Sequence, residues 1–369
     1  MAKARETVLE LDLKALAHNY HYLRSKLRAE TKFLSVVKAF AYGSDTQIIA
    51  KKLQELGTDY FAVAYTSEGV TLRDAGITKP ILVLHPQEVS FEILIERCLE
   101  PSIYSKNILN GFLETAKKHK QTKYPVHLKF NTGLNRLGFR ADEVAHVASI
   151  LNTTDAIKGV SVFSHLAASE DLAETEFTEL QISTFHTIAS ALDSILKNRP
   201  FRHLLNTSGI INYPQAQYDM VRSGIALYGY GNEAGIDKEL KPVASLKTII
   251  AQIHHLGANE SVGYNRGFFT ASSPKTTATL PLGHADGIGR QYGNGKTFVS
   301  VHGKKAPIIG NVCMDMIMID ITGINCEEGD EVLIFGPELS AHKFAETANT
   351  ISYELLTGIS QRVRRSIIY

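Results

Sequence analysis

Lys38 is the residue whose surroundings first suggest chemistry. It follows a run of uncharged residues inside "FLSVVKAFAYGSD", residues 33–45. A lysine at the end of a strand usually extends its ammonium group to water. In a dry pocket, by contrast, a lysine amine loses its proton more easily and becomes a nucleophile that forms a Schiff base with an aldehyde. The rest of the chain has to distinguish these two interpretations.

Further reactive residues lie at or near the ends of later strand-like runs. They are Lys129 in the fifth run, His165 after the sixth, Ser208 after the seventh, and Arg222 with Gly224 after the eighth. One histidine or arginine in such a place is more often structural. If the strands are parallel, however, their carboxyl ends share one face of the fold, so we expect these side chains to converge on a single site.

Small residues near the last two runs are suited to binding a phosphate group. "NTSG" supplies the Ser208 hydroxyl, and "VRSGIALYG" supplies backbone N–H groups at Gly224 and Ile225. Backbone amides at such turns are a common way to hold phosphate, although many Gly-containing turns only close loops. Combined with a Schiff-base lysine, they predict a cofactor with an aldehyde at one end and a phosphate at the other. Pyridoxal phosphate has both.

The elements that must position these residues alternate between strands and helices from about residue 31. Eight strand-like runs are separated by segments with helical periodicity. These runs cover residues 32–39, 60–65, 81–86, 101–105, 126–131, 159–165, 202–208 and 218–224. Alternation implies parallel pairing, and eight units are the number that closes a (β/α)8 barrel. An open doubly wound sheet is the competing fold, but no Gly-x-Gly-x-x-Gly turn follows the first strand.

Beyond residue 236 the pattern changes to strands separated by Gly-rich or Asn-rich turns, without helices between them. These runs cover residues 243–256, 276–285, 296–303, 305–312, 314–322 and 330–336, and a helix over 342–359 and a strand over 362–369 follow them. The pattern is typical of mostly antiparallel β-structure. A further strand over residues 7–13 precedes the first helical pattern, and we expect it to pair with this second part of the chain.

The predicted fold is therefore of the α/β class, with an N-terminal (β/α)8 barrel followed by a mostly antiparallel β C-terminal domain. We place the barrel at residues 10–235 and the β domain at 236–369, with the strand in residues 1–9 added to it.

Composition excludes several functional classes. The chain has 369 residues, 44% of them hydrophobic, and a formal net charge of +1, which gives no electrostatic footprint for nucleic acid or an anionic membrane. The first residues lack the apolar run of a signal peptide, and no later stretch is long enough to cross a bilayer. Its three cysteines, Cys98, Cys313 and Cys326, lack metal-ligand spacing and suit a reducing compartment. We expect a cytoplasmic protein without a metal site.

Eight motifs resemble, in order, those of the alanine racemase family, and the resemblance spans essentially the whole chain. The motifs are "VVKAFAYG", "HLKFNTGLNRLGF", "FSHLA", "NTSG", "VRSGIALYG", "VGYNR", "GHADGIGR" and "GNVCMDMIMID". The resemblance implies a pyridoxal phosphate-dependent isomerase that interconverts L-alanine and D-alanine by a two-base mechanism. It also implies a role in D-alanine biosynthesis for cell-wall peptidoglycan.

The resemblance assigns roles to individual residues. Lys38 would be the Schiff-base lysine and one catalytic base, and Tyr264 in "VGYNR" would be the second base. Arg222 would face the pyridine nitrogen with His165 behind it. The positions that would contact the cofactor phosphate are Tyr42, Ser208, Gly224, Ile225 and Tyr353.

Four more positions follow from the same resemblance. Arg136 would contact the cofactor or the substrate carboxylate, and Met314 with Asp315 would lie on the carboxylate side of the substrate. Lys129 matches a lysine that is carbamylated in many relatives, although an unmodified lysine remains an alternative. The second base lies in the β domain and Lys38 in the barrel, so the resemblance implies a head-to-tail homodimer with shared sites.

Arg222 also separates the main alternatives on chemical grounds. A guanidinium donates hydrogen bonds and accepts none, so a pyridine nitrogen facing it stays unprotonated and the ring withdraws electrons weakly. A carboxylate in that place would favour a decarboxylase or aminotransferase. A decarboxylase of the same two-domain plan is therefore disfavoured, and a non-catalytic pyridoxal phosphate-binding protein is disfavoured by the presence of the β domain and Tyr264.

The chain departs from the family pattern at two places that matter for the site. His284 stands where the family usually has a tyrosine in the substrate corridor, and Asn131 stands where an Asp is usual. Selectivity for alanine over serine stays open, because an apolar pocket discriminates against an added hydroxyl by only about a hundredfold.

Overall fold

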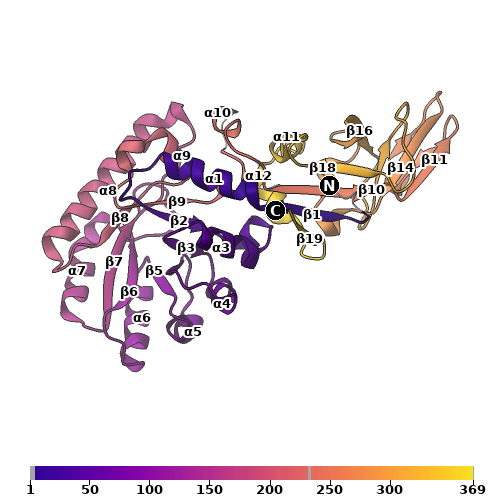
Figure 1. Ribbon diagram of the computed structural model, residues 1–369. Coiled ribbons are helices and arrows are strands. Elements are labelled where there is room, and N and C mark those ends of the chain that lie inside the picture. The colour runs from indigo at the N-terminus through magenta and orange to yellow at the C-terminus, as the bar shows by residue number, and fades with distance from the viewer. Residues whose placement is uncertain (1–4, 232–233, 369) are drawn as a thin grey trace.

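The structure is a computed structural model that describes residues 5–231 and 234–368. The predicted domain ranges also include residues 1–4, 232–233 and 369, which lie outside this description. Figure 1 shows two bodies joined end to end, with the barrel and its helices in indigo to magenta and the β domain in orange to yellow. The predicted fold class is confirmed, while the predicted domain boundaries stay a prediction.

Eight parallel strands form a closed barrel, and each overlaps one of the predicted runs. The strands are β2 (Lys32–Val36), β3 (Tyr60–Val63), β4 (Ile81–Val83), β5 (Glu100–Ile103), β6 (Tyr124–Lys129), β7 (Ile157–Phe163), β8 (Phe201–His203) and β9 (Met220–Ser223). The barrel closes where β9 pairs with β2, with Val221 opposite Phe33. The carboxyl ends of all eight strands therefore face the same side.

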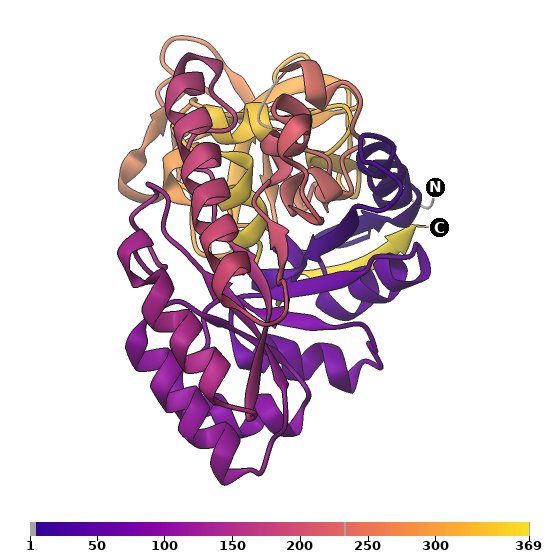
Figure 2. The same cartoon turned by 90° about the vertical axis from the view of Figure 1, so that its left-hand side faces the viewer.

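Helices cover the outside of the barrel (Figure 2). They are α1 (Leu13–Ser25), α3 (Thr46–Glu55), α4 (Thr66–Asp74), α5 (Phe91–Glu96), α6 (Lys106–Lys118), α7 (Val144–Thr153) and α8 (Thr175–Ile195), with the short α9 (Thr207–Asn212) and α10 (Ala234–Asp237) later in the chain. Helix α6 shows why such segments fold: Ser105 caps its first turn through Ile108 N–H at 3.3 Å, and Phe112 on its apolar stripe is fully buried.

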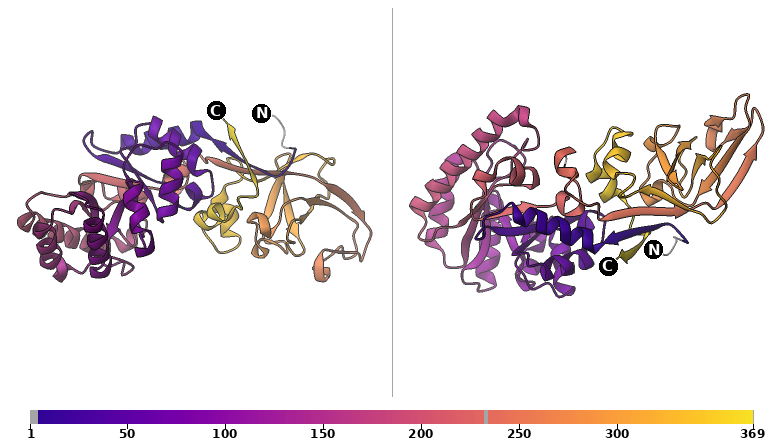
Figure 3. Two further views of the ribbon diagram at one scale, coloured as in Figure 1. Left: turned by 90° about the horizontal axis from the view of Figure 1, so that it is seen from below. Right: turned by 45° about the horizontal axis from the view of Figure 1, so that its top comes forward.

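The second domain is a nine-stranded sheet, and its strands are antiparallel except for one pair. In spatial order they are β11 (Gln252–Leu256), β14 (Lys275–Leu280), β17 (Ile317–Asp320), β16 (Lys304–Ile309), β15 (Phe298–Val301), β18 (Glu331–Phe335), β10 (Ala244–Ile249), β1 (Val8–Asp12) and β19 (Arg364–Ile368). Strand β1 pairs with β10 and with β19, so the N-terminal strand belongs to this sheet. Figure 3 shows this strand, in indigo near the N label, leading from the second domain to the barrel.

Two predicted elements are each divided in the structure. The run 243–256 is two strands, because the chain changes partner after Ile250: β10 pairs with β18, whereas Ala251 N–H already bonds to Thr279 and β11 pairs with β14. The helix over 342–359 is α11 (Ala341–Glu346) and α12 (Ser352–Gly358). Asn349 between them has a φ of 54°, which a continuous right-handed helix does not allow. A small ribbon of β12 (Ser261–Val262) and β13 (Phe268–Phe269) completes the domain.

Candidate active site

Ten of the predicted site residues line one cavity of about 770 Å³ at the carboxyl ends of the barrel strands. They are Lys38, Tyr42, Lys129, Arg136, His165, Ser208, Arg222, Gly224, Ile225 and Tyr353. All but Tyr353 come from the barrel. Tyr353 comes from α12, and Gly43 lies so close to this helix that a Cβ on it would be 1.9 Å from the Leu356 carbonyl oxygen.

The chain next to Lys38 has an unusual conformation. Strand β2 ends at Val36, earlier than predicted, and Ala39, Phe40, Ala41 and Tyr42 all have φ angles between 51° and 55°. This is one turn of left-handed helix, labelled α2 (Lys38–Tyr42), in residues that normally avoid it at a cost of about 1–2 kcal/mol each. Such backbone strain clusters at functional sites. Here it brings the side chains of Lys38 and Tyr42 to the same cavity.

Glu68, which sequence reasoning missed, holds the peptide after Lys38. Its carboxylate accepts a hydrogen bond from Ala39 N–H at 2.6 Å and one from Ala64 N–H, at the end of β3, at 2.7 Å. One side chain therefore joins the ends of two neighbouring strands. The only sequence signal was an acidic residue in the first turn of α4.

The cavity has a strong excess of positive charge. Lys38, Lys129, Arg136 and Arg222 line it, and Glu170 is the one acidic residue among its described lining. Burial and the nearby Arg136 lower the pKa of Lys38. Burial, Arg136 and Arg222 lower the pKa of Lys129 to about 8. The site therefore makes its amines easier to deprotonate and attracts anions such as phosphate or carboxylate.

Arg222 is buried and fixed by the barrel. Its Nη2 donates to the carbonyl oxygens of Ser164 and Leu204 at 2.7 and 2.9 Å, and its Nη1 donates to the ring of His203 at 2.9 Å. His165 Nδ1 lies 3.3 Å from Nη2. Burial lowers the pKa of Arg222 to about 9, so the guanidinium stays charged at neutral pH.

Both histidines beside Arg222 are neutral acceptors. Burial and the positive charge of Arg222 lower the pKa of His165 and of His203 well below the usual value for histidine. His203 was not predicted as a site residue; its only signal was a histidine in the seventh strand-like run.

Tyr42 closes the end of the cavity near Gly224. Its ring stacks on Tyr228 with a centroid distance of 4.6 Å and lies 6.0 Å from that of Tyr353. A Cβ on Gly224 would be 2.1 Å from the Tyr42 hydroxyl oxygen, so this approach requires glycine.

This approach makes the substitution Gly224→Ala informative. We expect it to displace Tyr42 and to lower the free energy of unfolding by about 1–3 kcal/mol, the usual cost of overpacking. The matched control is Gly235→Ala, because a Cβ on this exposed residue would contact nothing within 4 Å. Urea unfolding of both variants measures the difference, and equal stability would contradict the close contact.

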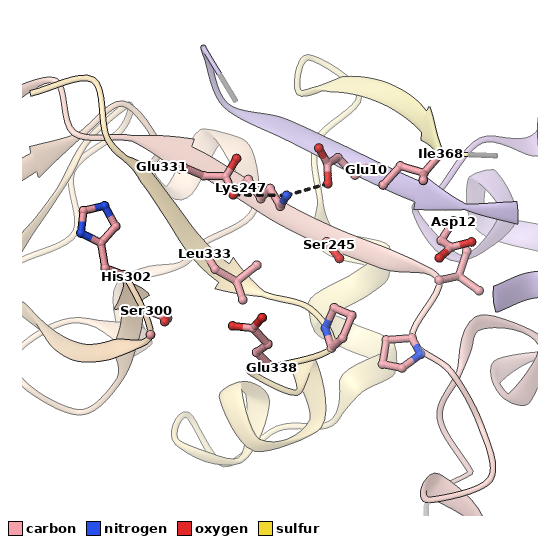
Figure 4. Close-up of a pocket in the computed structure, with 14 residues that line it drawn as sticks. Glu10, Asp12, Ser245, Lys247, Ser300, His302, Glu331, Leu333, Glu338 and Ile368 are labelled. Atoms are coloured by element: carbon pink, nitrogen blue, oxygen red, sulfur yellow. Dashed lines mark ion pairs between the residues drawn. The ribbon is translucent and has the colours of Figure 1, made fainter. Parts of the chain in front are cut away.

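A second cavity, of about 400 Å³, lies on the sheet of the β domain. Figure 4 shows Lys247 between two carboxylates, and its Nζ lies 2.9 Å from Glu10 and 3.2 Å from Glu331. These ion pairs raise the pKa of Lys247, so its amine is held as the ammonium ion. None of the predicted site residues lines this cavity.

Comparison with known proteins points to one family for both domains. The family models for the N-terminal and C-terminal domains of alanine racemase match residues 11–232 and 243–367. The alanine racemase of Halothermothrix orenii is 37% identical over 369 residues, which cover 98% of this chain and 96% of that protein. The chain belongs to the alanine racemase family. It is therefore an isomerase, and the racemase reaction follows from this membership.

Solved structures of alanine racemases share the whole fold. That of Clostridium difficile has a TM-score of 0.92 and 32% sequence identity, and the match covers 100% of this chain and 97% of that one. The alanine racemase of Bacillus anthracis, solved with bound L-Ala-P, has a TM-score of 0.91 and 30% identity, with 100% and 96% covered.

The unusual Asn131 fits the local structure of this family member. Its side-chain oxygen accepts hydrogen bonds from Gly133 N–H at 3.1 Å and Asn135 N–H at 3.0 Å, and its amide nitrogen donates to the Asn135 side chain at 2.8 Å. Asn131 therefore orders the loop that carries Arg136.

Three predicted racemase residues lie on the second domain and do not line the barrel cavity of their own chain. Tyr264 is 74% exposed, and the Met314 side chain is 59% exposed. The Asp315 carboxylate forms an ion pair with Arg362 at 2.5 Å. Hydrogen bonds join these loops: the Asn311 side-chain amide donates to the Tyr264 carbonyl oxygen, and His284 N–H donates to the Cys313 carbonyl oxygen.

Within residues 5–231 and 234–368, no helix has the length and apolar character needed to span a membrane.

Proposed function

We propose that the chain interconverts L-alanine and D-alanine by a two-base mechanism with pyridoxal phosphate, using Lys38 and Tyr264 as the bases. The observation that supports this most is the composition of the barrel cavity. Lys38 with its lowered pKa, the buried Arg222 and the close approach of Tyr42 to Gly224 all lie in it. We also propose that this reaction supplies D-alanine for peptidoglycan.

The residues present fit pyridoxal phosphate. Tyr42, Ser208, Gly224, Ile225 and Tyr353 line the cavity and would hold the phosphate, which the cationic lining attracts. When bound, the cofactor supplies an aldehyde that condenses with amines and a ring that withdraws electron density from the substrate Cα.

Lys38 and Arg222 would direct the reaction toward racemisation. The lowered pKa of Lys38 makes its amine easier to deprotonate, as it must be to attach the aldehyde and later to move a proton at the substrate Cα. Arg222 would donate to the pyridine nitrogen and keep it unprotonated, because a guanidinium has no proton acceptor. A proton removed from Cα would then return to Cα rather than to the cofactor, which favours racemisation over transamination.

The second base would come from a second copy of the chain. Tyr264, Met314 and Met316 are all exposed on the β domain, and Asn311 joins the segment before Met314 to the Tyr264 carbonyl oxygen. Exposed apolar residues of this kind mark protein interfaces. A head-to-tail homodimer would place this surface over the partner's barrel, with Met314, Asp315 and Arg136 beside the substrate carboxylate.

We also propose that Lys129 is carbamylated and that the new carboxylate orients Arg136. The pKa of Lys129 is lowered to about 8, so the neutral amine that reacts with carbon dioxide becomes abundant as the pH rises through 8. Intact-mass spectrometry should show the added mass of carbon dioxide, increasing between pH 7 and 9 in bicarbonate. The control is Lys51→Ala, which replaces an exposed lysine on α3 and should keep the added mass. The variant Lys129→Ala should lose the added mass, and its retention would contradict the assignment.

The proposed activity is tested with L-alanine in deuterated water. We expect loss of optical rotation together with deuterium at Cα, because each proton removed exchanges with solvent. Release of carbon dioxide would instead indicate a decarboxylase, and binding of the cofactor without exchange would indicate a non-catalytic protein. The three cysteines are unpaired, which supports the proposal of a cytoplasmic location.

A further inference from the structure

A row of polar side chains leads from Arg222 on β9 through the barrel interior. The four beyond Arg222, which the proposed function does not use, are His203 on β8, Ser161 on β7, His127 on β6 and Glu100 on β5. Each therefore lies on the strand next to the previous one. The two histidines and Ser161 are fully buried, and the Glu100 side chain is 12% exposed.

These five side chains form one continuous chain of hydrogen bonds, which we call the interior relay. Arg222 Nη1 lies 2.9 Å from His203 Nδ1, and His203 Nε2 lies 3.0 Å from Ser161 Oγ. Ser161 Oγ lies 2.5 Å from His127 Nδ1, and His127 Nε2 lies 2.6 Å from Glu100 Oε2.

The two ends of the interior relay set the direction of every proton. A guanidinium only donates, so His203 Nδ1 must accept and its single proton lies on Nε2, facing Ser161. Within the described part of the chain, the Ser161 hydroxyl bonds only to the two imidazoles, so it accepts from His203 and donates to His127. His127 then donates its Nε2–H to Glu100, whose carboxylate only accepts.

This arrangement gives Arg222 a remote counter-charge. Among the described residues its direct partners are carbonyl oxygens and neutral imidazoles, and none is a carboxylate. A buried charge without any compensation is unfavourable, and hydrogen bonds in a chain polarise one another in a low-dielectric interior. Glu100 therefore strengthens His203 as an acceptor for Arg222. Because Nη1 and Nη2 are engaged by the barrel, the Nε–H remains for the cavity.

We propose that His203, Ser161, His127 and Glu100 are positioning residues that orient Arg222 and keep its Nε–H directed at the cofactor ring nitrogen. The relay supplies negative charge from the far end of the barrel interior without placing a carboxylate beside the ring. This inference rests on the proposed function, since the ring nitrogen belongs to the proposed cofactor.

The proton arrangement is tested first in the cofactor-free protein. NMR of ¹⁵N-histidine-labelled protein, assigned with His203→Asn and His127→Asn variants, should show a proton on Nε2 of each ring and none on Nδ1. A proton on Nδ1 of either ring, or a doubly protonated ring, would overturn the proposal. Because this measurement needs no cofactor, its result does not depend on whether the proposed function is correct.

The link to Arg222 is tested with Ser161→Ala, which interrupts the relay, and Glu100→Gln, which removes the terminal charge. The matched control is Ser35→Ala, because Ser35 is also fully buried in the barrel but bonds to Thr58, at 2.8 Å. The His203 resonances should change in Ser161→Ala and stay as in the wild type in Ser35→Ala. Unchanged resonances in Ser161→Ala would overturn the proposal.

The cofactor-bound enzyme gives the second readout, the ratio of transamination to racemisation. In transamination the amino group of alanine passes to the cofactor aldehyde, whose carbon is reduced to the amine, while Cα is oxidised and takes its oxygen from water to give pyruvate. Losing one ordinary hydrogen bond corresponds to a factor of about five. We expect this increase in pyruvate per racemisation event for Ser161→Ala and Glu100→Gln, and none for Ser35→Ala. A wild-type ratio in both relay variants would overturn the proposal.

Discussion

Lys38→Ala should lower the rate of racemisation by about 10³-fold or more, because it removes both the cofactor attachment and a base. The variant should still fold, because the side chain belongs to a cluster of like charges and its removal relieves repulsion. For the same reason the pKa of Lys129, which Lys38 lowers, should rise. A polarimetric or coupled assay for D-alanine measures the loss.

The control for this variant is Lys51→Ala, which removes an exposed lysine from α3 and should leave activity unchanged. Thermal unfolding of both variants separates a catalytic loss from a folding defect. If Lys38→Ala kept a tenth of the activity, the amine could not be the attachment point.

Tyr264→Phe should lower racemisation by about 10²–10⁴-fold, the usual contribution of a general acid–base group. The two-base proposal predicts a specific residual activity. Lys38 can still move a proton on its own face of Cα, so one enantiomer of alanine should keep exchanging Cα–H with deuterated water, while the other should not. NMR of each enantiomer in deuterated water measures this asymmetry, and Tyr22→Phe on α1 is the control. Equal loss of exchange for both enantiomers would contradict two separate bases.

The same two variants test whether sites are shared between chains. Mixed after gentle dissociation, Lys38→Ala and Tyr264→Phe chains would form hybrid dimers in which one site has both defects and the other has neither. Activity should therefore return on mixing two inactive proteins. No recovery, or a fully active monomer by light scattering, would contradict the proposed dimer.

Much of the barrel could be predicted because its signals are local. Short apolar runs alternating with amphipathic helices identify the eight strands, and their carboxyl ends place Lys38, Lys129 and Arg222 on one face. The second sheet was harder in detail. Residues 250–251 divide a continuous apolar run because β10 and β11 pair with different neighbours. The local sequence does not show which distant strand a segment pairs with.

The features that the sequence did not reveal depend on three-dimensional context. Ala39, Phe40 and Ala41 all disfavour positive φ angles, so the left-handed turn after Lys38 contradicts local preference and is imposed by the surrounding fold. Glu68 acts through a hydrogen bond to Ala39, 29 positions away. The interior relay spans five strands, and only barrel closure makes its members neighbours.

The attachment of the cofactor to Lys38 is tested most directly by chemical trapping. The protein is incubated with pyridoxal phosphate, reduced with borohydride, digested, and mapped by mass spectrometry. The proposal predicts the reduced pyridoxyl group on the peptide that contains Lys38. A label on Lys129 or another lysine, or no covalent label at all, would contradict it.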